Sequence, residues 1–214
     1  QSRQQRVGLF LILRNAIPSI AYLMDSYLYS IFMTTPAFLQ SLFLIDMIAS
    51  TGASWSFGRF LSKYASREKH LAWLIGGTTA LAAVVSCSNV GLIEVLNHKR
   101  VSWTAKAVTI FVKIVLGWTS EWKFLPDVVL ATVHVNPRAY DDTAGRQSNR
   151  RALEYGALIS CIDFGDQLGA LLAGPLIDWL GISRENDWTD LDLLQEINSI
   201  LMFLSIALLA IIWR

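Results

Sequence analysis

Charged side chains that stand inside long apolar segments are the residues of this sequence best suited to chemistry. A charge near the middle of a bilayer costs about 2.5–3.5 kcal/mol on insertion scales, so it needs a partner of opposite charge or a wet cavity. Such charges are concentrated in four of the apolar segments and are nearly absent from the centres of the other two. The candidates for lining a substrate or ion cavity are Asp25, Asp46, Lys113, Glu121, Asp163 and Asp166.

The spacing of these charges predicts which of them meet. With a helical rise of about 1.5 Å per residue, Asp25, Asp46 and Lys113 fall about one turn from the centres of their segments, on the same side. Glu121 and Asp163 fall at a similar depth on the other side. We therefore expect Asp25 and Lys113 to pair, directly or through water. Two interpretations stay open: a polar cavity that binds a solute or relays protons, or a set of structural ion pairs that locks the helices together.

The elements that must position these charges are membrane-spanning helices. Hydrophobic residues make up 53% of the 214 residues and charged residues 16%, whereas ordinary globular domains carry about 25% charge. The apolar residues come in blocks, several of which reach the roughly 20 residues that a helix needs to cross a bilayer. This composition predicts an all-α polytopic membrane protein, a single six-helix transmembrane domain over residues 1–214. The predicted spans are residues 7–33, 38–62, 71–96, 103–133, 152–180 and 191–213.

Lysine and arginine in the predicted loops indicate the orientation. With the N-terminus inside, ten of them lie on the inner side and three on the outer side. Because positive charge is enriched on the cytoplasmic side of membrane proteins, both termini are predicted to face the cytoplasm, stroma or matrix. An organellar membrane is among the locations that fit this prediction.

Several function classes have no support in the sequence. The net charge is +1, so binding to nucleic acid lacks the electrostatic term that it requires. His70, His98 and His134 lie in loops or at span ends and not at metal-ligand spacing, and there is no glycine-rich phosphate loop. Cys87 and Cys161 stand in apolar segments, where cysteine acts as a small packing residue. We therefore expect neither an enzyme nor a metal site, and the sequence identifies no cofactor.

Small residues in the fifth predicted span favour close helix packing. Gly165, Gly169 and Ala173 recur every four residues, and Ala170 precedes Gly174 by four. Small residues at this spacing let two membrane helices approach closely. We expect this face, Gly165, Gly169 and Gly174 together, to offer a packing surface to a protein partner.

A set of short segments, in order along residues 18–204, resembles the C-terminal six-helix half of the folate–biopterin transporter family, a branch of the major facilitator superfamily. The resemblance implies half of a major-facilitator-type bundle and a folate- or biopterin-type substrate. It also implies that the first, second, fourth and fifth spans line a central cavity while the third and sixth are peripheral and face lipid. The charge distribution predicts the same partition. The segments are Ile17-Pro-Ser-Ile, Thr35-Pro-Ala-Phe-Leu39, Phe124-Leu-Pro-Asp-Val-Val-Leu130, Asn136-Pro137, Ala157-Leu-Ile-Ser160, Asp163-Phe-Gly165 and Leu180-Gly-Ile-Ser183.

The sequence departs from the facilitator pattern at the expected gating loop, residues 58–67. Ser62 replaces the acidic residue of that loop and Ala65 replaces its second glycine. Two functions therefore stay open: a solute transporter half, or a non-transporting structural or accessory subunit of a large multisubunit membrane complex of respiratory or photosynthetic type. In both cases we expect a protein partner, whether a second half, a second copy or subunits of a complex, to cover the charged face, since lipid cannot satisfy charges.

Overall fold

The computed structural model describes residues 3–18, 20–61, 68–98, 102–135, 144–186 and 188–210. Every regular element within these ranges is helical, which confirms the all-α prediction. Most of the expected gating loop, residues 62–67, and Asn136–Pro137 lie outside the described residues. The elements are α1 (Arg3–Asn15), α2 (Ala21–Phe32), α3 (Pro36–Ser56), the π-helix η1 (Phe57–Leu61), α5 (Glu68–Ser86), α6 (Ser88–His98), α7 (Trp103–Val135), α8 (Ala144–Leu180), α9 (Leu191–Ser205) and the 3-10 helix η2 (Ile206–Leu208).

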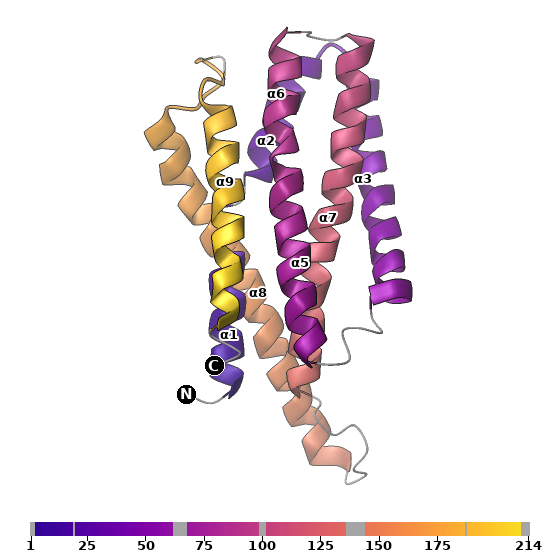
Figure 1. Cartoon of the computed structure of the whole chain (residues 1–214), viewed down its shortest axis with the longest axis vertical. Coiled ribbons are helices and arrows are strands. Elements are labelled where there is room, and N and C mark those ends of the chain that lie inside the picture. The colour runs from indigo at the N-terminus through magenta and orange to yellow at the C-terminus, as the bar shows by residue number, and fades with distance from the viewer. Residues whose placement is uncertain are drawn as a thin grey trace.

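The helices form an elongated bundle. In Figure 1, α3, α7, the α5–α6 pair and α9 follow one another side by side, and α8 runs obliquely to this row. α8 packs along α1 and also against α7. The first residues of α1 and the last residues of α9 lie at the same end of the bundle (Figure 1).

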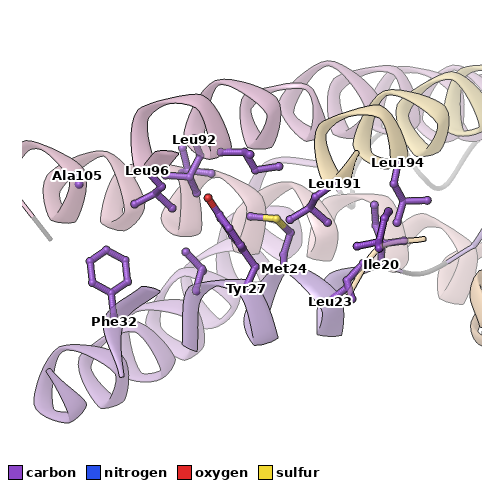
Figure 2. Close-up of a cluster of buried hydrophobic side chains, with 14 residues drawn as sticks. Ile20, Leu23, Met24, Tyr27, Phe32, Leu92, Leu96, Ala105, Leu191 and Leu194 are labelled. Carbon is purple, nitrogen blue, oxygen red and sulfur yellow. The ribbon is translucent and has the colours of Figure 1, made fainter. Parts of the chain in front are cut away.

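Two separate apolar cores occupy the two ends of this bundle. The first core joins α2, α6, the start of α7 and the start of α9, and Figure 2 shows Met24 and Tyr27 of α2 pointing toward Leu92, Leu96 and Leu191. The second core joins α1, the start of α5, the end of α7 and α8 around Phe10, Ile75 and Leu130. Helices α7 and α9 begin in the first core and run to the second, whereas α8 runs in the opposite direction. The chain therefore passes repeatedly along the bundle from one core to the other.

The first predicted span, residues 7–33, is wrong as a continuous helix. It consists of α1 and α2, separated by residues 16–20. Pro18 explains the break, because a proline disfavours helical geometry at the residue before it. Asn15 closes α1 by donating its side-chain amide to the Leu11 carbonyl at 2.9 Å. The break leaves backbone groups of both helix ends in the interior of the bundle, where Ile17 and Pro18 contact a cavity.

Four described helical segments are long and apolar enough to cross a membrane, so the chain is an integral membrane protein. They are residues Pro36–Arg59, His70–Asn97, Ala152–Leu180 and Leu191–Leu208, close to four of the six predicted spans. The other two are not among them. α1 and α2, with 13 and 12 residues, are each too short, and α7, although 33 residues long, carries several charges along its length.

The third and sixth predicted spans do not simply face lipid. α5 and α9 pack against each other, and α6 also contacts α7 and α9. α9 buries Gln195, Asn198 and Ser199 in the bundle while Ile200 and Phe203 on its other side are exposed. The prediction that these spans are peripheral is therefore wrong for their inner faces, because an uncharged polar stripe was not counted as a sign of a lined interior.

Two glycines of α8, Gly165 and Gly169, pack against α1 within the chain. A Cβ at Gly165 would stand 2.7 Å from the Ile12 carbonyl oxygen, and one at Gly169 would stand 3.0 Å from the Asn15 carbonyl oxygen, so α8 contacts the backbone of α1 directly. Gly174 has no such neighbour within 4 Å. Close packing is thus confirmed for Gly165 and Gly169, but the expectation that the three glycines form one surface for another protein is wrong.

Candidate functional site

A polar cavity of about 430 Å³ lies between the two apolar cores. Its walls come from the break between α1 and α2, from the end of α5 and the start of α6, and from parts of α2, α3, α7, α8 and α9. The cavity therefore occupies the middle of the bundle, with an apolar core toward either end. The charged residues that line it are Asp25, Asp46, Lys113, Lys123 and Asp166.

Asp25 of α2 and Lys113 of α7 form a direct ion pair in this cavity. The Lys113 ammonium donates a hydrogen bond to Oδ1 of Asp25, which confirms the pairing predicted from depth. The Asp25 side chain is 43% exposed and the Lys113 side chain 20% exposed. The pair is thus only partly buried.

Asp46 brings a further carboxylate to the cavity from α3. Its side chain lies over Gly117 of α7, where a Cβ would be 2.7 Å from Asp46 Oδ1. Glycine at position 117 thus lets α3 and α7 approach with the carboxylate between them. Within the described part of the chain, no residue pairs with Asp46 or hydrogen-bonds to its side chain. A carboxylate without a cation is well placed to accept hydrogen bonds from a solute.

A buried ion pair that was missed from the sequence lies next to the cavity residues Asn15 and Lys123. Arg14 Nε lies 3.0 Å from Asp127 Oδ2, and the two side chains are 2% and 0% exposed. Arg14 Nη2 also donates to the Lys123 carbonyl oxygen at 3.1 Å, which ties the end of α1 to α7. The Lys123 ammonium interacts electrostatically with Asp127 and with the cavity residue Asp166. The available signal was a single arginine inside an apolar run, which requires an acid nearby.

The structure thus brings together four of the predicted candidates, Asp25, Asp46, Lys113 and Asp166, in one cavity. It does not bring in the other two. Glu121 faces Ser54, whose hydroxyl lies 3.4 Å from Glu121 Oε2, and Asp163 is exposed on α8; neither is among the lining residues.

Uncharged polar side chains of α6 and α9 also line the cavity, and the sequence reasoning missed them. Asn89 of α6 and Gln195 and Asn198 of α9 all line the cavity and are buried. Their signal was weak but present, because residues 195 and 198 are three apart and share one helix face. Among the described residues, no group of His, Cys, Asp and Glu side chains is arranged to hold a metal ion.

The ion pair of the cavity can be tested by a double-mutant cycle. Lys113→Leu alone should lower the free energy of unfolding by about 1–3 kcal/mol, because it leaves the half-buried Asp25 carboxylate unpaired. Adding Asp25→Leu should restore part of the loss, which we expect to see by titrating SDS into mild-detergent micelles. If the two single substitutions are simply additive, the residues are not coupled.

Comparisons with family models, with curated proteins and with solved structures find no match to this chain.

Proposed function

We propose that this chain is one half of a facilitator-type solute transporter and that the polar cavity between its two apolar cores is the solute site. The cavity is the observation that carries the proposal. Transporters of this type bind their solute near the bilayer midplane, and a polar site with packed helices toward either end fits the occluded state of alternating access. A bundle held together only by apolar packing would have no reason to keep three aspartates and two lysines around one space.

The pairing of the helices supports this proposal. Each six-helix half of a facilitator contains two three-helix repeats of inverted topology. In this chain the first repeat would be α1–α2, α3 and α5–α6, and the second would be α7, α8 and α9, in corresponding order. The contact between α3 and α7 then corresponds to the contact between α8 and α1. The contact between α5 and α9 maps onto itself. The contact between α5 and α7 has a weaker counterpart, between η2 and α1.

The break in the first span is a second supporting feature. Transporters often build their sites from discontinuous helices, whose free backbone groups contact the solute or ion. Here Ile17 and Pro18 at the break line the cavity together with Asn15. We assign Asp46 and Asp166 to accepting hydrogen bonds from the solute and the lysines, Lys113 and Lys123, to its anionic groups. The family resemblance makes a folate- or biopterin-type compound the first candidate.

Under this proposal a protein partner covers the open side of the cavity. Asp25 is partly exposed there, and Asp163 and Asp166 on α8 are exposed. Charges on a lipid-facing surface would each cost several kcal/mol, about 2.5 or more on insertion scales. A second half, a second copy of the chain or neighbouring subunits would remove that cost.

The alternative, a non-transporting accessory subunit, is favoured by one observation. Two ion pairs, Asp25 with Lys113 and Arg14 with Asp127, are already formed inside the chain. Charges that neutralise one another serve a scaffold as well as they serve a transporter. The unpaired Asp46 carboxylate favours the transporter over this alternative.

Gentle solubilisation from native membranes, followed by mass measurement of the intact assembly, separates the two functions. A homo-oligomer, or a pair with one protein of similar topology, is the expected result. Its reconstitution into liposomes should give saturable uptake of labelled folate or biopterin, reduced at least about tenfold by Asp46→Asn, since the loss of one charge-assisted hydrogen bond costs about that factor. Recovery only within a large multisubunit assembly, without uptake, would support the accessory subunit instead.

Labelling of single cysteines tests whether α7 and the α1–α2 segment cross the membrane. Single cysteines are placed, in a background with Cys87→Ala and Cys161→Ala, at Gln4 and Arg146, expected inside, and at Thr34 and Asn97, expected outside. An impermeant thiol reagent applied from outside should label only the cysteines at positions 34 and 97. Labelling at both 97 and 146 would disprove the crossing by α7, and labelling at both 4 and 34 would disprove the crossing by α1–α2.

A further inference from the structure

We propose that the wall formed by α6 and α9 is a second subsite of the cavity, which binds an uncharged group that both donates and accepts hydrogen bonds, of the carboxamide class. This inference rests on the proposed solute site. It adds to the charged residues a subsite on two helices that the charge pattern had placed outside the cavity.

Three amide side chains form this subsite. Asn89 donates its side-chain amide to Gln195 Oε1 at 3.4 Å, which links α6 to α9. Asn198 follows one turn further along α9, on the same face as Gln195. Asn89 is 7% exposed, Gln195 1% and Asn198 6%, and all three line the cavity. The amides are therefore withdrawn from the lipid face and directed inward.

Two of these amides carry acceptors that the protein leaves unpaired. Within the described residues, Asn89 Oδ1 and Asn198 Oδ1 are fully buried and have no hydrogen-bond partner. Buried side-chain oxygens are almost always paired in folded proteins, so each unpaired one calls for an explanation. Both residues line the cavity, so rotation of the side-chain amide about χ2, a soft torsion in asparagine, would present each oxygen to a donor on a solute.

The chemistry of the wall selects the class of group. The subsite consists of amides alone, which offer both donors and acceptors and no charge. An ionised group placed here would find no opposite charge, whereas an apolar group would leave the two oxygens unpaired. A neutral group with an N–H donor and a C=O acceptor, such as a primary carboxamide, complements the wall. The charged part of the solute would then lie toward Asp46 of α3 and Lys113 of α7, which line the same cavity.

Thermal unfolding in mild detergent tests the subsite with two probes. L-Glutamine carries a carboxamide on a short zwitterionic frame, and L-norleucine has the same frame with an apolar end. Saturating glutamine should raise the unfolding midpoint by about 2–4 °C, as expected for ligand binding to a protein of this size. Norleucine should give at most a small shift. Asn89→Leu and Asn198→Leu should each lose the glutamine response.

The same variants without any ligand give an independent readout. If the amides serve the solute, Asn198→Leu removes only an unpaired buried acceptor and should unfold at the wild-type temperature or above it. Asn89→Leu also removes the donor to Gln195 Oε1, so it should unfold at lower temperature in either case. If the amides serve only to hold α6 against α9, Asn198→Leu should also unfold at lower temperature, and both variants should keep the glutamine response. Asn89→Ser and Asn198→Ser keep a smaller polar group and should lose the response in part. The matched control is Asn97→Leu, which removes an amide of α6 that accepts a bond from Tyr27 outside the cavity, and it should keep the full response.

Three results would overturn the proposal, and one of them separates it from the proposed function. Equal shifts with glutamine and norleucine, both lost in Lys113→Met, would support the proposed solute site but rule out the amide subsite. No shift with either probe would rule out the carboxamide class. A glutamine shift that survives Asn198→Leu, Asn89→Leu and Lys113→Met alike would place binding outside the cavity.

Discussion

Replacement of Asp127 by leucine, with Arg14 left in place, is expected to lower the free energy of unfolding by about 3–5 kcal/mol. Both side chains are essentially inaccessible, and the Arg14 guanidinium would lose its counter-ion in the interior of the bundle. An uncompensated buried charge is more costly than a missing ion pair, because neither water nor lipid can solvate it. SDS titration of the purified protein in mild-detergent micelles measures the loss.

The double variant Arg14→Met with Asp127→Leu is the decisive control. It removes both charges and should recover most of the lost stability, since replacing a buried pair by apolar side chains is often close to neutral. Asp178→Leu, which removes an exposed aspartate near the end of α8, should change stability by no more than about 0.5 kcal/mol. If the double variant is as unstable as Asp127→Leu, the instability of the single variant does not come from the unpaired Arg14 charge.

Gly169→Ala is expected to destabilise the protein by about 1–3 kcal/mol, through overpacking. The added methyl would meet the carbonyl oxygens of Ile17 and Asn15, which are backbone atoms of the break between α1 and α2 and cannot move aside alone. Either α8 shifts as a whole or the break is distorted. Because residues at the break line the cavity, solute binding should weaken together with stability.

Gly156→Ala in the same helix provides the matched control. No atom of a neighbouring element lies within 4 Å of a Cβ placed there, so alanine should only stiffen the unfolded chain and favour the helix, raising stability by up to about 1 kcal/mol. The two substitutions are chemically identical, but their effects on stability should have opposite signs because only Gly169 lies against another helix. If both stabilise, the close approach of α8 to α1 is not present in the membrane.

Several features could be predicted because they depend only on the length of each apolar block or on the position of a residue along its own helix. The length of the apolar blocks led to an all-α membrane protein and to four spans that agree with the structure within a few residues, apart from the end of the last. The shared depth of Asp25 and Lys113 was enough to predict their pairing, although 88 positions separate them. Depth along a helix follows from the sequence, since the rise per residue is nearly constant.

Only the tertiary structure decided which faces turn toward each other. Lys106, Lys113, Ser120 and Asp127 recur every seven residues along α7, a spacing that predicts one shared face. Lys113 and Ser120 do line the cavity, but Asp127 is enclosed with Arg14 and Lys106 lies over the Phe38 ring. An α-helix drifts about 20° per heptad relative to a strict seven-residue repeat, so residues 21 positions apart need not face the same neighbour.

For the amides of α6 and α9, too, the sequence shows some features and only the structure shows the others. Their types and spacing are in the sequence, but an asparagine inside an apolar run reveals neither its partner nor its direction. The inward orientation of Asn89, Gln195 and Asn198 follows from the packing of α5 and α6 against α9. Which helices pack together depends on contacts between residues far apart along the chain, and such contacts leave no local periodic signal. The sequence by itself therefore determined the helices and the depth of their charges, and tertiary packing decided which polar groups share one cavity.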